Sequence, residues 1–192
     1  MVMDHSGTTT LALALLPCVK RIVSLDIEPF LEEFDRPYWK AAGVSDKIET
    51  KIGDGTASLA DLKARGDTFD FVYIDADKGG YIKYYEAALE MLAPGGVILV
   101  DNTLMKASPF GLRRSGKLTR TPRLVHTRHL TCRKATLQAR RCTSKRSLPR
   151  WAEHELTLSA VNRFNAHVKA DERVNVVIVP LRDGVTMIQR KL

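Results

Sequence analysis

The chain has 192 residues, 44% hydrophobic and 27% charged, which excludes a disordered or fibrous protein and gives room for one domain. Its three cysteines are too few for a disulfide framework, so we expect a reducing, cytoplasmic setting. The formal net charge of +8 comes from residues 106–150, which hold 14 Lys and Arg residues and no acid, whereas the rest of the chain is net acidic.

The chain opens on a glycine and threonine turn followed by an apolar run, TTTLALALLPCV, at residues 8–19. This run is far shorter than the ~20 apolar residues that span a bilayer. A signal peptide has Lys or Arg before its apolar run, and none precedes this one. We therefore expect a buried helix here and no membrane association.

Strand and helix patterns then alternate along the chain. Apolar, β-branched runs predict strands, and segments with helical spacing between them predict helices, with Thr56 as an N-cap and Gly66 as a helix terminator. The expected strands cover residues 21–26, 47–55, 69–75 and 97–102, and the expected helices cover 29–43, 56–66 and 81–92. This alternation predicts an α/β fold in which helices cover both faces of a parallel sheet.

The C-terminal part adds a different unit. Residues 154–172 have the spacing of a helix, and residues 174–180 and 185–191 are two strand-like runs joined by LRDG. A hairpin of this kind is a common antiparallel addition to the edge of a mixed sheet. We expect one domain over residues 1–192, in which 106–150 form a basic, irregular insert.

Polar side chains follow several of the expected strands. In an open α/β sheet, ligands bind at this place, outside the carboxyl ends of the strands. If the third and fourth strands are neighbours, about 4.8 Å apart, then Asp75, Asp101 and Asn102 converge as hard oxygen donors suited to Mg²⁺, Mn²⁺ or Ca²⁺. Asp26 is placed to bind ribose hydroxyls of a nucleotide. The alternative is that these residues only form turns or precede helices.

The chain resembles the cation-dependent O-methyltransferases of the caffeoyl-CoA and catechol type. The resemblance covers nearly everything except the first residues and the basic insert, and its long central block is the most specific part. It is carried by SGTTTLALALLP, LDIEP, RPYWKAAGVSDKIETKIGDG, FDFVYIDADKGGYIKYYEAALEMLAPGGVILVDNTL and FNAHVKADERVNVVIVPLRDGVTMIQRK.

The resemblance implies a Rossmann-like methyltransferase fold with S-adenosyl-L-methionine and a divalent cation, usually Mg²⁺, in one cleft, and a small hydroxylated aromatic substrate. Lys78 matches the family's general base; a neighbouring cation would favour its neutral, proton-accepting amine. The metal ligands of the family match Asp75, Asp101 and Asn102. The cofactor-binding positions of the family match Gly7, Thr9, Asp26, Gly55 and Asp77. A homodimer is compatible with the family.

Two departures from the family pattern stand out. Only MVMDHS precedes Gly7, so we expect the first, central strand to be largely missing and cofactor binding to be weak. The basic insert replaces a short substrate loop, and we interpret it as a solvated loop. Alternatives are a nucleic-acid or protein-binding tether in a catalytically impaired chain, and a zinc site built from His126, His129, Cys132 and Cys142.

Overall fold

The computed structural model describes residues 1–3, 7–104 and 150–191, so nearly all of the basic insert lies outside the described residues. The described part contains seven strands, five α-helices and one 3₁₀ helix. The strands are β1 (Val2–Met3), β2 (Ile22–Asp26), β3 (Ile48–Ile52), β4 (Phe69–Ile74), β5 (Leu92–Asp101), β6 (Val174–Val179) and β7 (Val185–Arg190). The helices are α1 (Thr8–Ala14), α2 (Pro29–Ala41), η1 (Ser45–Lys47), α3 (Gly55–Ala64), α4 (Tyr81–Glu90) and α6 (Arg150–Ala170).

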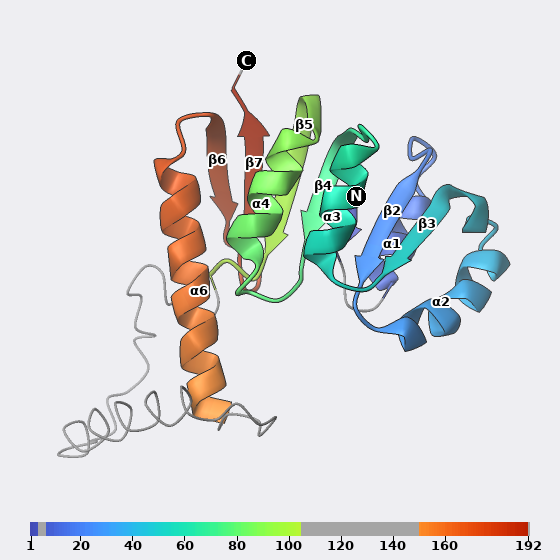
Figure 1. Cartoon of the computed structure of the whole chain (residues 1–192), viewed down its shortest axis with the longest axis horizontal. Coiled ribbons are helices and arrows are strands. Elements are labelled where there is room, and N and C mark those ends of the chain that lie inside the picture. The colour runs from blue at the N-terminus through green and yellow to red at the C-terminus, as the bar shows by residue number, and fades with distance from the viewer. Residues whose placement is uncertain (4–6, 105–149, 192) are drawn as a thin grey trace.

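The strands form one sheet in the order β3-β2-β1-β4-β5-β7-β6 (Figure 1). β1 to β5 pair in parallel, whereas β7 pairs antiparallel with both β5 and β6. The expected α/β fold with a C-terminal antiparallel hairpin is therefore confirmed. Because β4 and β5 are neighbours, the polar residues that follow them meet at one edge of the sheet.

The first strand is short, as expected, but it is present at the centre of the sheet. Val2 pairs with Ser24 on one side and Tyr73 on the other, and the Tyr73 and Asp75 amides donate to Met1 O and Met3 O at 3.0 and 2.9 Å. The expected loss of most of the first strand is thus confirmed, and the two residues that remain keep its central position. Met1 and Met3 thus satisfy backbone amides of β4 and of the residue after it, which would otherwise be unpaired inside the molecule.

Helices cover both faces of the sheet (Figure 1), and an apolar core lies beneath them on each face. The larger core lies under α3, α4 and α6 and includes Leu62, Tyr85 and Phe164, all essentially without solvent exposure. The smaller core lies under α1 and α2 and includes Ala14 and Trp39. The expected buried helix at the N-terminus is buried only at Thr10 and Ala14. It ends at Ala14, and the two leucines that follow it are exposed.

Several element boundaries differ from the sequence expectations for local reasons. Asp54, not Thr56, caps α3, because its carboxylate accepts the Thr56 amide; Gly66 ends this helix with φ +75°, as expected. β5 begins at Leu92, before the PGG turn signal, and its pairing with β4 carries an irregularity there. α6 begins at Arg150, so the last residue of the expected insert is helical. No helix among the described residues is long and apolar enough to cross a membrane.

Four charged side chains form a network of ion pairs near the amino ends of the parallel strands, opposite to the ends that carry Asp75 and Asp101. Glu49 on β3 accepts from Arg21 at 2.6 Å and from Arg65 at 2.8 Å, and both arginines also bind Asp67 before β4. The hydrogen bonds from Arg65 and Arg21 lower the pKa of Glu49 from 4.5 to about 2. The Glu49 carboxylate therefore contributes stability above pH 4.5 that is lost as the pH falls toward 2.

Replacing Glu49 with glutamine is expected to remove this part of the acid sensitivity. Since the side chain is 35% exposed, solvent screening limits the effect to about 1 kcal/mol at neutral pH. Urea unfolding at pH 7 and pH 3 measures it: the wild-type and Glu49→Gln stabilities should differ at pH 7 and approach each other at pH 3. An equal difference at both pH values would contradict the role given to this carboxylate.

Candidate functional site

A hollow of about 480 Å³ opens at the carboxyl ends of the parallel strands. Its walls come from the ends of β1, β2, β3 and β4 and from the starts of α3 and α4. The residues important for the chemistry of this hollow are Met3, Asp26, Gly55, Asp75, Asp77 and Tyr84. Three predicted cofactor positions and one predicted metal ligand therefore share one space.

Lys78 is the centre of the polar cluster at this edge. Its Nζ donates to Asp75 Oδ1 at 2.9 Å and to Asn102 Oδ1 at 2.8 Å, and it also contacts the hydroxyl of Tyr81. Only 15% of the Lys78 side chain is exposed. The turn that follows β4 thus places the Lys78 ammonium group between two predicted metal ligands, Asp75 and Asn102.

Asp101, the third predicted metal ligand, is held separately. Its Oδ2 accepts from the Tyr73 hydroxyl at 2.9 Å, and its Oδ1 accepts from the Asn102 amide at 2.6 Å. This turn places Asn102 at φ +58°, a conformation that asparagine tolerates better than most residues. Asp101 therefore fixes the position of Asn102 and remains within the same polar cluster.

The donor set fits a hard divalent cation by its chemistry. Two carboxylates and one amide oxygen are the ligands that Mg²⁺ prefers, and Asp75 and Asn102 already direct their oxygens to one cationic nitrogen atom. Among the described residues there is no cluster of three His, Cys, Asp or Glu side chains suited to a metal. A metal at this edge would therefore need the Asn102 amide.

Tyr81 belongs to the cluster, although the sequence reasoning treated it only as part of an amphipathic helix. Its hydroxyl contacts Lys78 Nζ and donates to the Asp101 carbonyl at 3.0 Å, and the Nζ lies 4.6 Å from its ring centroid. Burial, followed by the charges of Asp75 and Asp101, raises the pKa of Tyr81. Tyr81 thus remains a neutral hydrogen-bonding group. Its spacing of three residues from Lys78 at a helix start was the available signal.

The predicted cofactor positions divide into two groups. Asp26, Gly55 and Asp77 line the hollow. Asp26 Oδ1 accepts the Glu28 amide at 2.9 Å, which is the turn role left open from the sequence. Gly7 caps α1 at φ +60°, and a Cβ there would lie 1.9 Å from Asp35, while Thr9 is on α1; neither residue lines the hollow.

Tyr84 is a second aromatic residue that the sequence reasoning missed. Its hydroxyl donates to Asp77, whose other oxygen accepts the Gly80 amide at 2.8 Å. Burial and the hydrogen bond to Asp77 raise the pKa of Tyr84. Asp77 is therefore oriented by two donors at the wall of the hollow.

Replacing Gly80 with alanine is expected to destabilise the protein by about 1–3 kcal/mol, because the new Cβ would lie 2.4 Å from the Tyr84 ring. Gly79 offers a matched control, since a Cβ there would meet only Asp77 at 3.5 Å. Chemical denaturation of both variants measures the difference. Equal effects of Gly80→Ala and Gly79→Ala would contradict the packing of Tyr84 described here.

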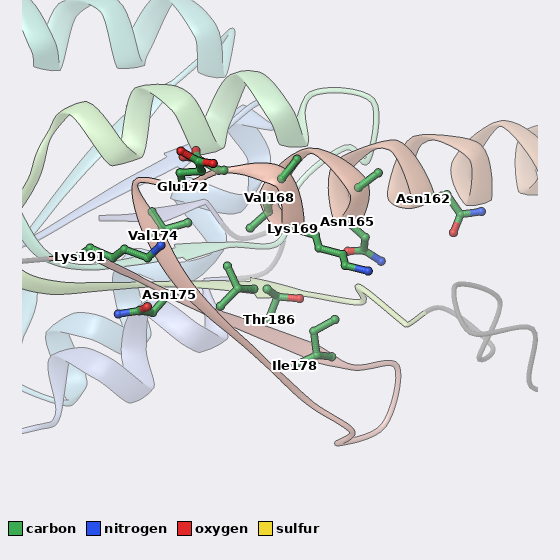
Figure 2. A pocket seen from close by; sticks show the side chains of 14 residues that line it. Asn162, Asn165, Val168, Lys169, Glu172, Val174, Asn175, Ile178, Thr186 and Lys191 are labelled. Atoms are coloured by element: carbon green, nitrogen blue, oxygen red, sulfur yellow. The ribbon is translucent and has the colours of Figure 1, made fainter.

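A larger groove, of about 830 Å³, lies between α6 and the β6–β7 hairpin (Figure 2). Its lining mixes apolar residues such as Val174 and Ile178 with Asn165, Lys169 and Lys191. Despite its size, none of the predicted site residues lines it. We place the candidate site in the smaller hollow and in the cluster around Lys78 beside it; Asp75 belongs to both, whereas Lys78, Asp101 and Asn102 do not line the hollow.

Sequence comparison identifies the family to which the chain belongs. The chain matches the family model described as O-methyltransferase over residues 3–112 and 147–191, and it therefore belongs to the O-methyltransferase family. A probable caffeoyl-CoA O-methyltransferase of Dictyostelium discoideum is 29% identical over 172 residues, 88% of this chain and 58% of that protein. The mouse catechol O-methyltransferase domain-containing protein 1 is 29% identical over 95% of this chain and 56% of its own length. The chain thus spans less than two thirds of these relatives.

Solved structures show the same fold. The SAM complex of TomG from Streptomyces achromogenes superposes with a TM-score of 0.70 at 19% identity, covering 100% of this chain and 73% of that chain. The SAH-bound Podospora anserina methyltransferase PaMTH1 gives 0.69 at 24% identity, covering 100% and 70%. The expected methyltransferase fold is therefore confirmed.

Proposed function

We propose that this chain is an S-adenosyl-L-methionine-dependent and divalent-metal-dependent O-methyltransferase that acts on a vicinal diol of the catechol or caffeoyl type. The observation that carries the proposal is the meeting of Asp75, Lys78 and Asn102 beside the hollow at the strand ends, in a member of the O-methyltransferase family. The names of the Dictyostelium and mouse relatives support the substrate class.

The hollow is the proposed cofactor site. Asp26 has one oxygen without a hydrogen-bond partner among the described residues, and its carboxylate can accept from ribose hydroxyls. Gly55 is the first residue of α3 and lines the hollow without a side chain. Two structural neighbours, TomG with bound SAM and PaMTH1 with bound SAH, support this choice of cofactor.

The residues of the chain would have separate roles in the reaction. When bound, S-adenosyl-L-methionine would supply the methyl group and a divalent ion would polarise the acceptor hydroxyl. Asp75, Asp101 and Asn102 would hold the ion, and the Lys78 amine would take the hydroxyl proton at Nζ. In the structure, Nζ donates to both Asp75 and Asn102, so it can accept a proton only after losing one and turning away from these acceptors. Positioning of the two reactants would supply most of the acceleration.

Methyl transfer from labelled S-adenosyl-L-methionine to catechol and to caffeoyl-CoA, with Mg²⁺ present, tests the proposal. Resorcinol is the matched control, because its two hydroxyls are too far apart to bind one ion together. We expect methylated product from catechol or caffeoyl-CoA and little from resorcinol. No product from either vicinal diol would refute the proposed activity, and equal methylation of resorcinol would refute the vicinal-diol requirement.

A further inference from the structure

The ammonium group of Lys78 lies between two of the three proposed metal ligands, Asp75 and Asn102. Its Nζ is 2.9 Å from Asp75 Oδ1 and 2.8 Å from Asn102 Oδ1. These are the lengths of charge-assisted hydrogen bonds to a cation, and the amide side chain of Asn102 has only one oxygen to offer. A divalent ion and the ammonium group would therefore need the same oxygen atom.

The charges around this point make the competition strong. Two carboxylates, Asp75 and Asp101, belong to the cluster, and no other lysine or arginine among the described residues contacts them or Asn102. Tyr81 carries a hydroxyl and no charge. One positive side chain is thus matched to two negative ones, and an incoming cation would meet both the attraction of the carboxylates and the repulsion of Lys78.

We infer that Lys78 is a built-in cation that fills the Asp75–Asn102 position in the absence of metal and competes with a divalent ion for it. The inference rests on the proposed function, because the ion concerned is the one that this function needs. The ring and hydroxyl of Tyr81 already contact Nζ, and these contacts could hold the ammonium group after an ion has taken its two acceptors. The residue proposed as base would then leave its acceptors when the ion binds.

Calorimetric titration of the whole chain with MgCl₂ alone tests the inference. Lys78→Met keeps the length of the side chain and removes its charge, and we expect Mg²⁺ to bind this variant about tenfold more tightly, ~1.4 kcal/mol. Lys63→Met is the matched control: it removes the same charge from α3, where Lys63 pairs with Glu90 at the surface. The control should bind Mg²⁺ as the wild type does.

The outcomes separate the inference from the function on which it rests. Mg²⁺ affinity that is equal in wild type and Lys78→Met, or weaker in the variant, would overturn the competition and leave the metal site standing. No Mg²⁺ binding by any variant would refute the metal-dependent function and the inference with it. If Lys78→Met does not fold, Lys78→Gln, which keeps a polar end without a charge, is expected to show the same tighter binding.

Discussion

Turnover of a catechol substrate is expected to fall about 10²–10⁴-fold when Lys78 is replaced by methionine, because the acceptor hydroxyl would lose its general base. Binding of S-adenosyl-L-methionine should change little, since the described Lys78 contacts are to Asp75, Tyr81 and Asn102 and not to the wall formed by Asp26. Steady-state kinetics at saturating substrate and a cofactor titration measure the two effects.

Lys63→Met serves again as the control and should retain wild-type turnover. The informative result is that Lys78→Met binds Mg²⁺ more tightly and turns over more slowly. A general loss of structure would instead lower both the Mg²⁺ affinity and the turnover. Unchanged turnover on a vicinal diol would show that Lys78 is not the base, whatever the affinity for the metal.

Cofactor affinity is expected to fall about tenfold or more when Asp26 is replaced by asparagine. A hydrogen bond to a charged acceptor contributes about 1.5–3 kcal/mol, and the asparagine amide lacks both the charge and one acceptor. The new side chain can still accept the Glu28 amide, so the turn before α2 should persist. Titration with S-adenosyl-L-methionine measures the change.

This substitution distinguishes the two interpretations that the sequence left open for Asp26. A residue that only forms the turn would leave cofactor affinity unchanged in Asp26→Asn. Asp46→Asn, in the exposed helix η1, is the control for the loss of one negative charge. Weakened binding in Asp26→Asn alone would support the ribose-binding role.

Much of the fold could be predicted because each element carries a local signal. The apolar run of β4 and the polar residues that follow β4 and β5 identified the end of the sheet that carries the site. This prediction assumed that β4 and β5 are neighbours, and they are. β1 carried no such signal, since two residues are too few for a pattern. Its strand is stabilised by β2 and β4 on either side.

The site was predicted in composition better than in arrangement. Residue types identified Asp75, Lys78 and Asn102, but the ammonium group between the two oxygens depends on how the turn after β4 folds back toward β5. Tyr81 and Tyr84 were missed because a tyrosine at helical spacing is most often a core residue. The roles expected for the basic insert lie outside the described residues and remain predictions.

The central claim is tested most directly by the metal dependence of methyl transfer to catechol. The chain is first treated with a chelator and dialysed, then assayed with S-adenosyl-L-methionine before and after MgCl₂ is added. We expect no methylated catechol from the chelated protein and a return of activity with Mg²⁺ that is lost again in Asp75→Asn. Methyl transfer at the same rate with and without Mg²⁺ would contradict a metal held by Asp75, Asp101 and Asn102.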